Sequence, residues 1–279
     1  MLRLARPSSQ AIFAGVATAI GGFLLFPVLW LVLTALKPDA EIFVKFPSLL
    51  PSSPTLAHFE QVLKAAGLAT YLLNSLLTAT GSAILTTVLA ALAAYGFAKF
   101  RFRARQPLML ALLAAQMFPF GVLLMTLYPM LKAVGLLDTL TGLTLSYIVF
   151  ALPTGTYMLY AYFAQIPDEL LEAARIDGAG ELTVMARVVL PLSFPGLIAV
   201  GVYAFMWAWN DLFYSLTIIS SKELRTVGPG LLLEFFGEMQ QDWGAAMAAS
   251  FLASAPVVLV FAFLQRYFIQ GLTAGAVKA

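Results

Sequence analysis

Six long stretches without a single lysine, arginine, aspartate or glutamate divide this chain and constrain its fold. They cover residues 7–36, 65–98, 106–131, 139–167, 188–210 and 243–265. A helix that crosses a lipid bilayer needs about 20 mostly apolar residues, so each stretch has room for one such helix. The fifth apolar stretch continues past Asp211, which predicts a helix over roughly 193–220. The sequence therefore predicts an all-α polytopic membrane protein with six transmembrane helices.

The composition excludes several other classes of protein. Of 279 residues, 61% are hydrophobic and 11% are charged, with a mean hydropathy of +0.90. A water-soluble domain of this length could not bury so much apolar surface. The net charge of +2 and the dispersed basic residues give no concentrated field for a nucleic-acid partner. The chain has no cysteine and only one histidine, His58, so we expect no metal site.

The basic residues predict the orientation of the chain. If the N-terminus lies inside, most of the sixteen lysines and arginines fall in the inner segments. The positive-inside rule then favours both termini in the cytoplasm. The run KFRFRAR at 99–105 contributes most to this asymmetry, and we interpret it as a topology anchor in preference to a lipid-binding site.

A charged segment, residues 172–191, lies between the fourth and fifth predicted spans on the cytoplasmic side, and the residues from Asp168 to Ile176 are expected to be helical. Asp168 follows a proline and suits the start of a helix, since a carboxylate complements the positive helix end. Asp177 and Gly178 supply a stop and a sharp turn. The composition argues against a helix lying on lipid, because carboxylates outnumber arginines and an anionic membrane surface would repel them.

A second short helix is predicted from Glu181 to about Leu190, ending at Pro191. Leu182, Met185 and Val189 recur at helical spacing and form an apolar stripe. The segment should therefore be a helix–turn–helix that presents an apolar ridge to a groove on a partner protein. A plain solvated connector is the alternative, and the spacing of the residues decides between them.

The spacing resembles the signature of the membrane-spanning subunits of binding-protein-dependent ABC importers. That signature reads EAA, three residues, Gly, nine residues, Ile, any residue and Leu-Pro. Here EAA at 172–174 is followed by Gly178 and by Leu190-Pro191, and only Val188 in place of isoleucine departs. The resemblance implies a cytoplasmic coupling helix between helices 4 and 5 that docks on an ATP-hydrolysing subunit. The implied contact residues are Glu172, Ala173, Ala174, Asp177, Gly178, Leu182, Met185, Leu190 and Pro191.

Three further stretches extend the resemblance. NSLLTA at 74–79 is similar to the family's usual start of its core permease domain, and AWNDLF at 208–213 and GLTAGAVKA at 271–279 are similar to carbohydrate permeases of the MalG type. The resemblance implies an N-terminal transmembrane helix and extracytoplasmic loop over 1–68 and a core permease domain over 69–279. It implies a bacterial or archaeal inner-membrane complex with a second, MalF-like permease, two ATPase subunits and an extracytoplasmic sugar-binding protein. The tail residues Gly271, Leu272, Thr273 and Gly275 are expected to contact the ATPase.

The chain itself lacks a nucleotide site. It contains no Gly-Lys dipeptide and therefore no G-x-x-x-x-G-K-[ST] loop, so ATP and Mg²⁺ are expected on partner subunits. Trp207, Asn210 and Asp211 are candidates for a carbohydrate pathway. An intramembrane enzyme is disfavoured because Asp211 is the only acid available for its site. An ion-coupled secondary transporter acting as a dimer stays as the alternative, with Asp211 as its best candidate residue. For Asp211 we prefer hydrogen bonding across a helix interface, or contact with water in the vestibule, to direct contact with the substrate.

Overall fold

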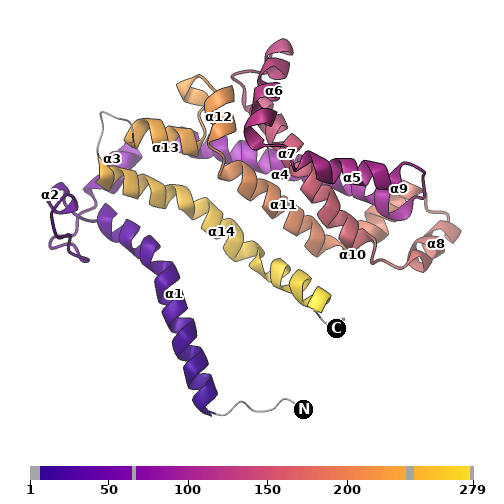
Figure 1. Cartoon of the computed structure of the whole chain (residues 1–279), viewed down its shortest axis with the longest axis horizontal. Coiled ribbons are helices and arrows are strands. Elements are labelled where there is room, and N and C mark those ends of the chain that lie inside the picture. Colours follow the sequence, from indigo (N-terminus) through magenta and orange to yellow (C-terminus); the bar gives the residue numbers. More distant parts are fainter. Residues whose placement is uncertain (1–6, 65–66, 237–241, 277–279) are drawn as a thin grey trace. The chain divides into compact units, whose positions relative to one another are not determined.

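The computed structural model describes residues 7–64, 67–236 and 242–276, and every secondary-structure element in these residues is helical, which confirms the all-α class. The longest helices are α1 (Pro7–Ala35), α4 (Leu68–Lys99), α7 (Leu140–Phe163), α11 (Phe194–Trp209) and α14 (Trp243–Ala276) (Figure 1). The shorter helices are α2 (Asp39–Ile42), α3 (Ala57–Lys64), α5 (Arg105–Ala115), α6 (Phe120–Ala133), α8 (Asp168–Ile176), α9 (Glu181–Val184), α10 (Leu190–Leu192), α12 (Phe213–Ile218) and α13 (Val227–Phe235). A π-helical turn covers Met185–Val189, and a 3₁₀ turn covers Lys222–Leu224.

Within the described ranges, four helices are long and apolar enough to cross a membrane. They are Phe13–Ala35, Leu68–Lys99, Leu140–Phe163 and Trp243–Leu264. A fifth candidate is the pair Glu181–Leu192 and Phe194–Trp209, which is bent by 82°. The chain is therefore a helical protein with several apolar spans.

The third charge-free stretch is broken, and neither of its helices is long enough to span alone. α5 ends at Ala115, and α6 begins only after Pro119, which has φ −57° and ψ 131°. Proline has no N–H to donate and disfavours helical geometry in the residue before it. Pro119 thus interrupts the helix that the sequence analysis predicts.

The prediction of one helix over 193–220 is wrong. α11 ends at Trp209, and a new helix, α12, starts at Phe213. The Asp211 carboxylate accepts hydrogen bonds from the backbone N–H groups of Tyr214 and Ser215 at 3.2 and 2.9 Å. These N–H groups belong to the first turn of α12, where no backbone acceptor is available, so Asp211 favours a fresh helix start.

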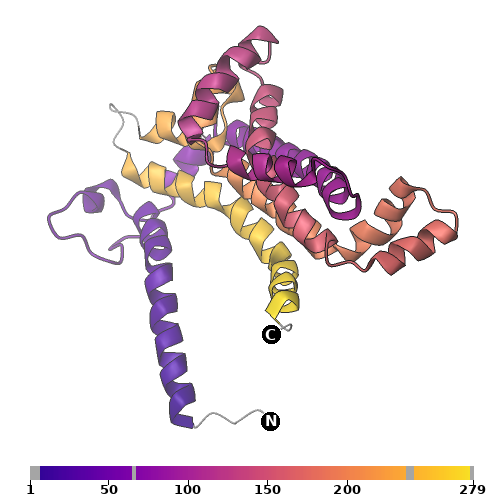
Figure 2. The same cartoon turned by 45° about the vertical axis from the view of Figure 1, so that its right-hand side comes forward.

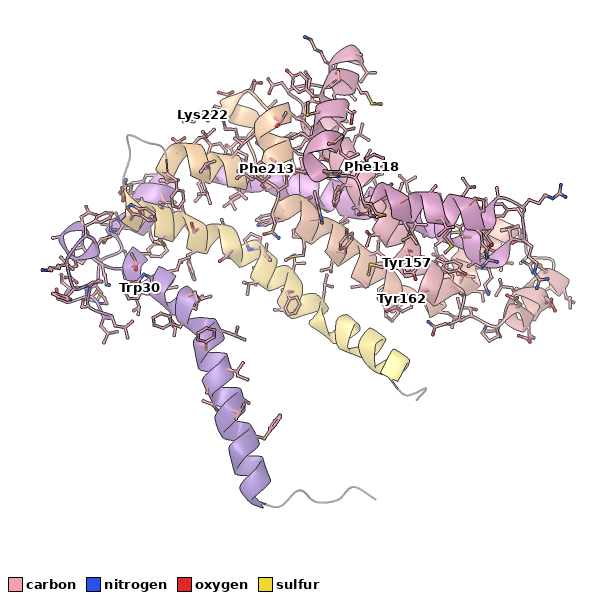
Figure 3. The ribbon with its side chains drawn as sticks, in the orientation of Figure 1. Trp30, Phe118, Tyr157, Tyr162, Phe213 and Lys222 are labelled. Carbon is pink, nitrogen blue, oxygen red and sulfur yellow. The ribbon has the colours of Figure 1, made fainter. Side chains whose placement is uncertain are left out.

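The chain separates into two compact units, residues 1–68 with 231–254 and residues 69–230 with 255–279. Residues 231–254, which the sequence analysis places in the core domain, group with the N-terminal unit, and the two-domain division stays a prediction. In the first unit the buried Lys37 donates to the Ser48 carbonyl at 2.5 Å and lies 4.7 Å from the ring centre of Trp30, labelled in Figure 3. These contacts offset part of the free-energy cost of burying the charged ammonium group.

Small residues allow close packing of helices in the second unit. Ala90 of α4 is fully buried in its core. A Cβ on Gly155 of α7 would lie 2.9 Å from Val200 of α11, and one on Gly196 of α11 would lie 2.7 Å from the ring of Tyr162 on α7. α7 and α11 therefore approach more closely than larger side chains would permit.

Candidate functional site

α8 ends in a Schellman motif, which explains the spacing between Ala174 and Gly178. The N–H of Ala179 donates to the Ala174 carbonyl, and the N–H of Gly178 donates to the Arg175 carbonyl, both at 3.0 Å. Gly178 has φ +86°, a left-handed conformation that glycine adopts without a side-chain penalty. The predicted stop and turn at Asp177 and Gly178 are confirmed. Figures 1 and 2 show the resulting α8–α9 hairpin at one end of the second unit.

An ion pair connects α8 to α9 across this turn. Arg175 Nε and Nη2 donate to Glu181 Oε1 and Oε2 at 2.8 and 3.3 Å. The hydroxyl of Tyr95 on α4 donates to Glu181 Oε2 at 2.7 Å. The hydrogen bonds from Arg175 and, next, from Tyr95 hold the pKa of Glu181 below its ordinary value. Since both partners are about 40% exposed, the pair orients the hairpin and adds little stability.

A second polar link fixes the beginning of α8 to the end of α4. Lys99 Nζ donates to Asp168 Oδ1 at 2.8 Å and to the Ile166 carbonyl at 2.6 Å. The lysine side chain is only 4% exposed, and its hydrogen bond and charge lower the pKa of Asp168. The hairpin is thus held to α4 at two points.

The inner face of the hairpin is apolar and belongs to this chain's own core. Leu171, Val184, Met185 and Val189 are buried and pack with alanines of α4 and with side chains of α7 and α11. The prediction that Met185 and Val189 form an exposed ridge is wrong, because the hairpin lies against these core helices and buries them. Of the predicted stripe, only Leu182 stays exposed.

The second helix of the hairpin also runs past its predicted end. Leu190 N–H bonds to the Met185 carbonyl, five residues back, and the helical run continues through Pro191 to Leu192. A π-helical turn accommodates Pro191 because proline has no N–H for the ordinary bond four residues back. The run bends by 82° into α11 after Ser193, which is buried.

The outer face of the hairpin combines acidic and apolar residues. Ile176 is 86% exposed and Leu182 is 76% exposed. Glu172 is exposed, and the structure shows no hydrogen bond or ion pair of its side chain with the residues it describes. A Cβ on Gly178 would meet no atom within 4 Å. Of the remaining predicted contact residues, Ala173, Asp177 and Pro191 are exposed, and Ala174 and Leu190 are half-buried.

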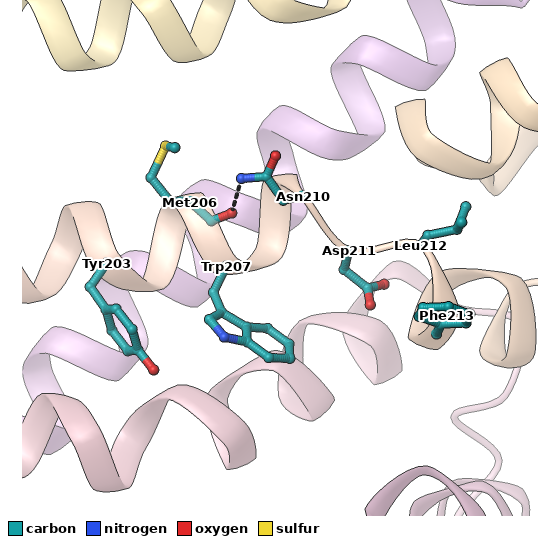
Figure 4. Close-up of a pocket in the computed structure, with 7 residues that line it drawn as sticks. All are labelled: Tyr203, Met206, Trp207, Asn210, Asp211, Leu212 and Phe213. Carbon is teal, nitrogen blue, oxygen red and sulfur yellow. Dashed lines mark hydrogen bonds between the residues drawn. The ribbon is translucent and has the colours of Figure 1, made fainter. Parts of the chain in front are cut away.

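The three predicted pathway residues meet in one cavity of about 530 Å³. Figure 4 shows Trp207, Asn210 and Asp211 among its lining residues, with Tyr203 beside Trp207 on α11. Trp207 packs against Phe150 with ring centres 3.7 Å apart and ring planes tilted by 30°. Asn210 is exposed and donates to the Met206 carbonyl at 2.8 Å, which leaves its amide oxygen available to a ligand.

The Asp211 carboxylate forms hydrogen bonds with other groups of this chain. The carboxylate accepts a hydrogen bond from the Tyr147 hydroxyl at 3.0 Å, in addition to those from the two N–H groups of α12. The residue is 7% exposed. Of the two roles preferred for Asp211, this geometry supports hydrogen bonding across a helix interface. The cavity therefore offers aromatic faces and an amide in place of a free charge.

The predicted tail residues Gly271, Leu272, Thr273 and Gly275 lie in the last turns of α14. The backbone stays helical through Ala276, so the glycines introduce no irregular path before that residue. Side chains beyond residue 264, and residues 277–279 altogether, lie outside the described set. Contact between the tail and an ATPase stays a prediction.

Comparison with known proteins decides the family. The model of the family "Binding-protein-dependent transport system inner membrane component" matches residues 83–274. The chain belongs to this family. Its relatives include the diacetylchitobiose permease DasC of Streptomyces coelicolor, 35% identical over 91% of this chain and 92% of the relative. They also include the trehalose permease SugB of Mycobacterium tuberculosis, 35% identical over 94% and 95%, and the trehalose/maltose permease MalG of Thermococcus litoralis, 32% identical over 91% of both.

The fold of this permease agrees with that assignment. A solved bacterial ABC transporter that imports the polysaccharide alginate superposes with a TM-score of 0.81 at 20% identity, over 95% of this chain and 99% of the other. The relatives confirm the resemblance to MalG-type permeases. Sequence reasoning missed Tyr95 and Lys99, the two residues that hold the hairpin of this permease. Their spacing of four at the end of a span was the only signal, since it places both on one helix face.

Proposed function

We propose that this permease forms part of the translocation pathway of an ATP-driven carbohydrate importer in a bacterial or archaeal inner membrane. The names of the relatives, which state diacetylchitobiose, trehalose and maltose, support a carbohydrate substrate. In this proposal a second, MalF-like permease, two ATPase subunits with ATP and Mg²⁺, and an extracytoplasmic binding protein complete the complex. α5 and α6 together act as the third of six spans, and both termini lie in the cytoplasm.

The observation that carries the proposal is the two-sided construction of the α8–α9 hairpin. Its inner face is packed into the core, whereas Glu172, Ile176 and Leu182 on its outer face have no cover within the described residues. An exposed acid beside exposed aliphatic residues suits a cleft with a basic residue and an apolar floor. We infer that the hairpin is the coupling helix and that the cleft belongs to an ATPase subunit.

Two routes carry a displacement of the hairpin into the spans. The first route runs through the contacts of Asp168 with Lys99 and of Glu181 with Tyr95, which would transmit a movement of the hairpin to α4. The bend at Ser193 passes movement to α11, a helix of about 24 Å at 1.5 Å per residue, whose far end carries the cavity. Closure of the ATPases on ATP would thus reorient the cavity and give alternating access, because packed helices move as rigid bodies.

The cavity suits a neutral, ring-shaped substrate. Trp207 and Tyr203 supply aromatic surface for the apolar face of a sugar, and Asn210 supplies a hydrogen-bonding amide. Asp211 positions α12 and does not coordinate a coupling ion in this proposal. In this proposal, recognition of the carbohydrate is shared with the binding protein and the second permease.

Reconstitution tests the proposal. The permease, its partner permease and the ATPase subunits are placed in proteoliposomes, and uptake of labelled disaccharides is measured with the binding protein outside. Uptake should require ATP on the ATPase side and should stop when the ATPase subunits are omitted. Full uptake by this chain alone, driven by a proton or sodium gradient, would instead establish the ion-coupled dimer.

A further inference from the structure

The loop between α4 and α5 forms a basic pocket of about 590 Å³ in the second unit. The residues that define this basic pocket are Arg101, Phe102, Arg103, Arg105, Gln106, Met109 and Tyr160. Tyr160 lies on α7, so two distant parts of the sequence build the pocket. An anchor that serves topology alone needs basic residues near a span, but it does not need a cavity.

The charges of the basic pocket are not neutralised by the residues that the structure describes. No carboxylate lines the cavity, and none of its three arginines forms an ion pair within the described ranges. The charge of Arg101 helps to lower the pKa of Asp168, but the Asp168 carboxylate already accepts a hydrogen bond from Lys99, which lowers this pKa most. Three positive charges around one cavity create a field that attracts an anion.

One of these arginines is held in a fixed orientation. Arg105 Nη2 donates to the Tyr160 hydroxyl at 2.8 Å, and its guanidinium carbon lies 5.5 Å from the centre of the same ring. A guanidinium oriented in this way retains donors for two parallel hydrogen bonds to a phosphate group. The Gln106 amide adds a further donor at the rim of the pocket. The pocket therefore fits a phosphate group better than a diffuse cloud of counterions.

The surroundings of the basic pocket are apolar on one side. The pocket lies where the candidate span α4 ends at Lys99, which puts it at a membrane surface. Met109 lines it, and on the same short helix Leu108 and Leu110 are 49% and 66% exposed. Phe102, also in the lining, is 42% exposed. Charged and apolar surfaces thus adjoin as they do in a phospholipid.

We propose that the basic pocket binds the phosphodiester headgroup of an anionic phospholipid, with the acyl chains along the exposed leucines of α5. A free phosphate ion would use the arginines but would leave the adjoining apolar surface without a function. The proposal does not depend on the identity of the transported carbohydrate. It replaces the interpretation of 99–105 as a topology anchor only.

Native mass spectrometry of the delipidated full complex tests this proposal. The complex is titrated with phosphatidylglycerol, with phosphatidylcholine and with soluble glycerol 3-phosphate. The test variants are R101K/R103K/R105K, which keeps every charge and thus the topology signal, and Tyr160→Phe, which frees Arg105. Arg225→Lys, outside the pocket, is the matched control, and helical content is checked for each variant.

We expect phosphatidylglycerol to bind at least about tenfold more tightly than phosphatidylcholine. The triple lysine variant should lose about tenfold in affinity, which corresponds to loss of a bidentate phosphate contact, and Tyr160→Phe should lose several-fold. Arg225→Lys should bind as the unaltered chain does. Equal binding of the two lipids, or unchanged affinity in the triple variant, overturns the proposal in favour of charge attraction alone. Competition by glycerol 3-phosphate at matching affinity overturns it in favour of a soluble phosphate. Absence of phosphatidylglycerol binding to the complex also overturns it, because a pocket covered by a partner subunit is no lipid site.

Discussion

Replacement of Gly178 by alanine should weaken the α8–α9 hairpin through the backbone alone. Gly178 has φ +86°, and a side chain in the left-handed region costs about 1–2 kcal/mol. The added Cβ would meet no atom within 4 Å, so no steric term contributes within this chain. Gly180 provides a matched control, because its φ of −72° suits any residue and a Cβ there also meets nothing. Gly180→Ala should change the stability by no more than about 1 kcal/mol, because the smaller chain entropy of alanine opposes its poorer fit as the N-cap of α9.

The penalty falls on the hydrogen bonds that close α8. A change of about 1–2 kcal/mol alters the ratio of closed to open turn by about 5- to 30-fold. Hydrogen exchange of the Gly178 and Ala179 amides, which donate to Arg175 and Ala174, should accelerate by that factor in Gly178→Ala and not in Gly180→Ala. Substrate-stimulated ATP hydrolysis by the reconstituted complex should fall only in the first variant. Equal exchange and equal hydrolysis in the two variants would refute the reasoning.

Three further predictions concern other parts of the chain. The hydrogen bonds from Arg175 lower the pKa of Glu181 in the folded chain, so the ionised Glu181 makes a small contribution to the stability of the hairpin above its ordinary pKa of 4.5. This contribution should be lost as the pH falls below 4.5, and hydrogen exchange over the hairpin measures the loss. Glu181→Gln should remove the pH dependence. Asp211→Ala should lower the free energy of unfolding of the purified permease by about 1–2 kcal/mol, because the first N–H groups of α12 lose their acceptor. Asp211→Asn should keep most carbohydrate uptake. Abolished uptake in Asp211→Asn would assign Asp211 to the substrate or to an ion. Reporter fusions after Ala104 should report the cytoplasm and fusions at Ser53 the outside, and the reverse pattern would contradict the orientation.

The sequence indicated the four long apolar helices and the turn at Gly178 because both depend on local chemistry. An uninterrupted apolar stretch has few alternatives to a buried or lipid-facing helix, and Gly178 follows Ala174 at the spacing of a Schellman motif. The presence of Pro119 did not decide whether the third predicted helix bends or is interrupted, since proline can do either. The new helix start at Asp211 depends on a carboxylate that folds back on the next turn, and apolarity alone does not reveal it.

Periodicity also could not show what an apolar face packs against. Met185 and Val189 lie on such a face, but the core cluster that they join is completed by residues of α4, α7 and α11, most of them far away in the sequence. The basic pocket has the same cause, because Tyr160 approaches Arg105 only after α4, α5 and α7 have packed. Local pattern predicts an element and its faces, whereas tertiary contacts decide which face remains free for a partner.

Charge reversal at Glu172 tests the central claim most directly, because this acid is exposed and makes no described contact within the chain. Glu172→Lys should change the stability of the permease by no more than about 0.5 kcal/mol, as a surface substitution does. Loss of an ion pair at the ATPase interface should cost about 2–5 kcal/mol. We therefore predict that the variant complex loses ATP-driven carbohydrate uptake while the permease stays folded in the membrane, and that reversing a basic residue in the ATPase cleft partly restores uptake. Undiminished ATP-driven uptake by Glu172→Lys would contradict the account of the hairpin as the coupling element.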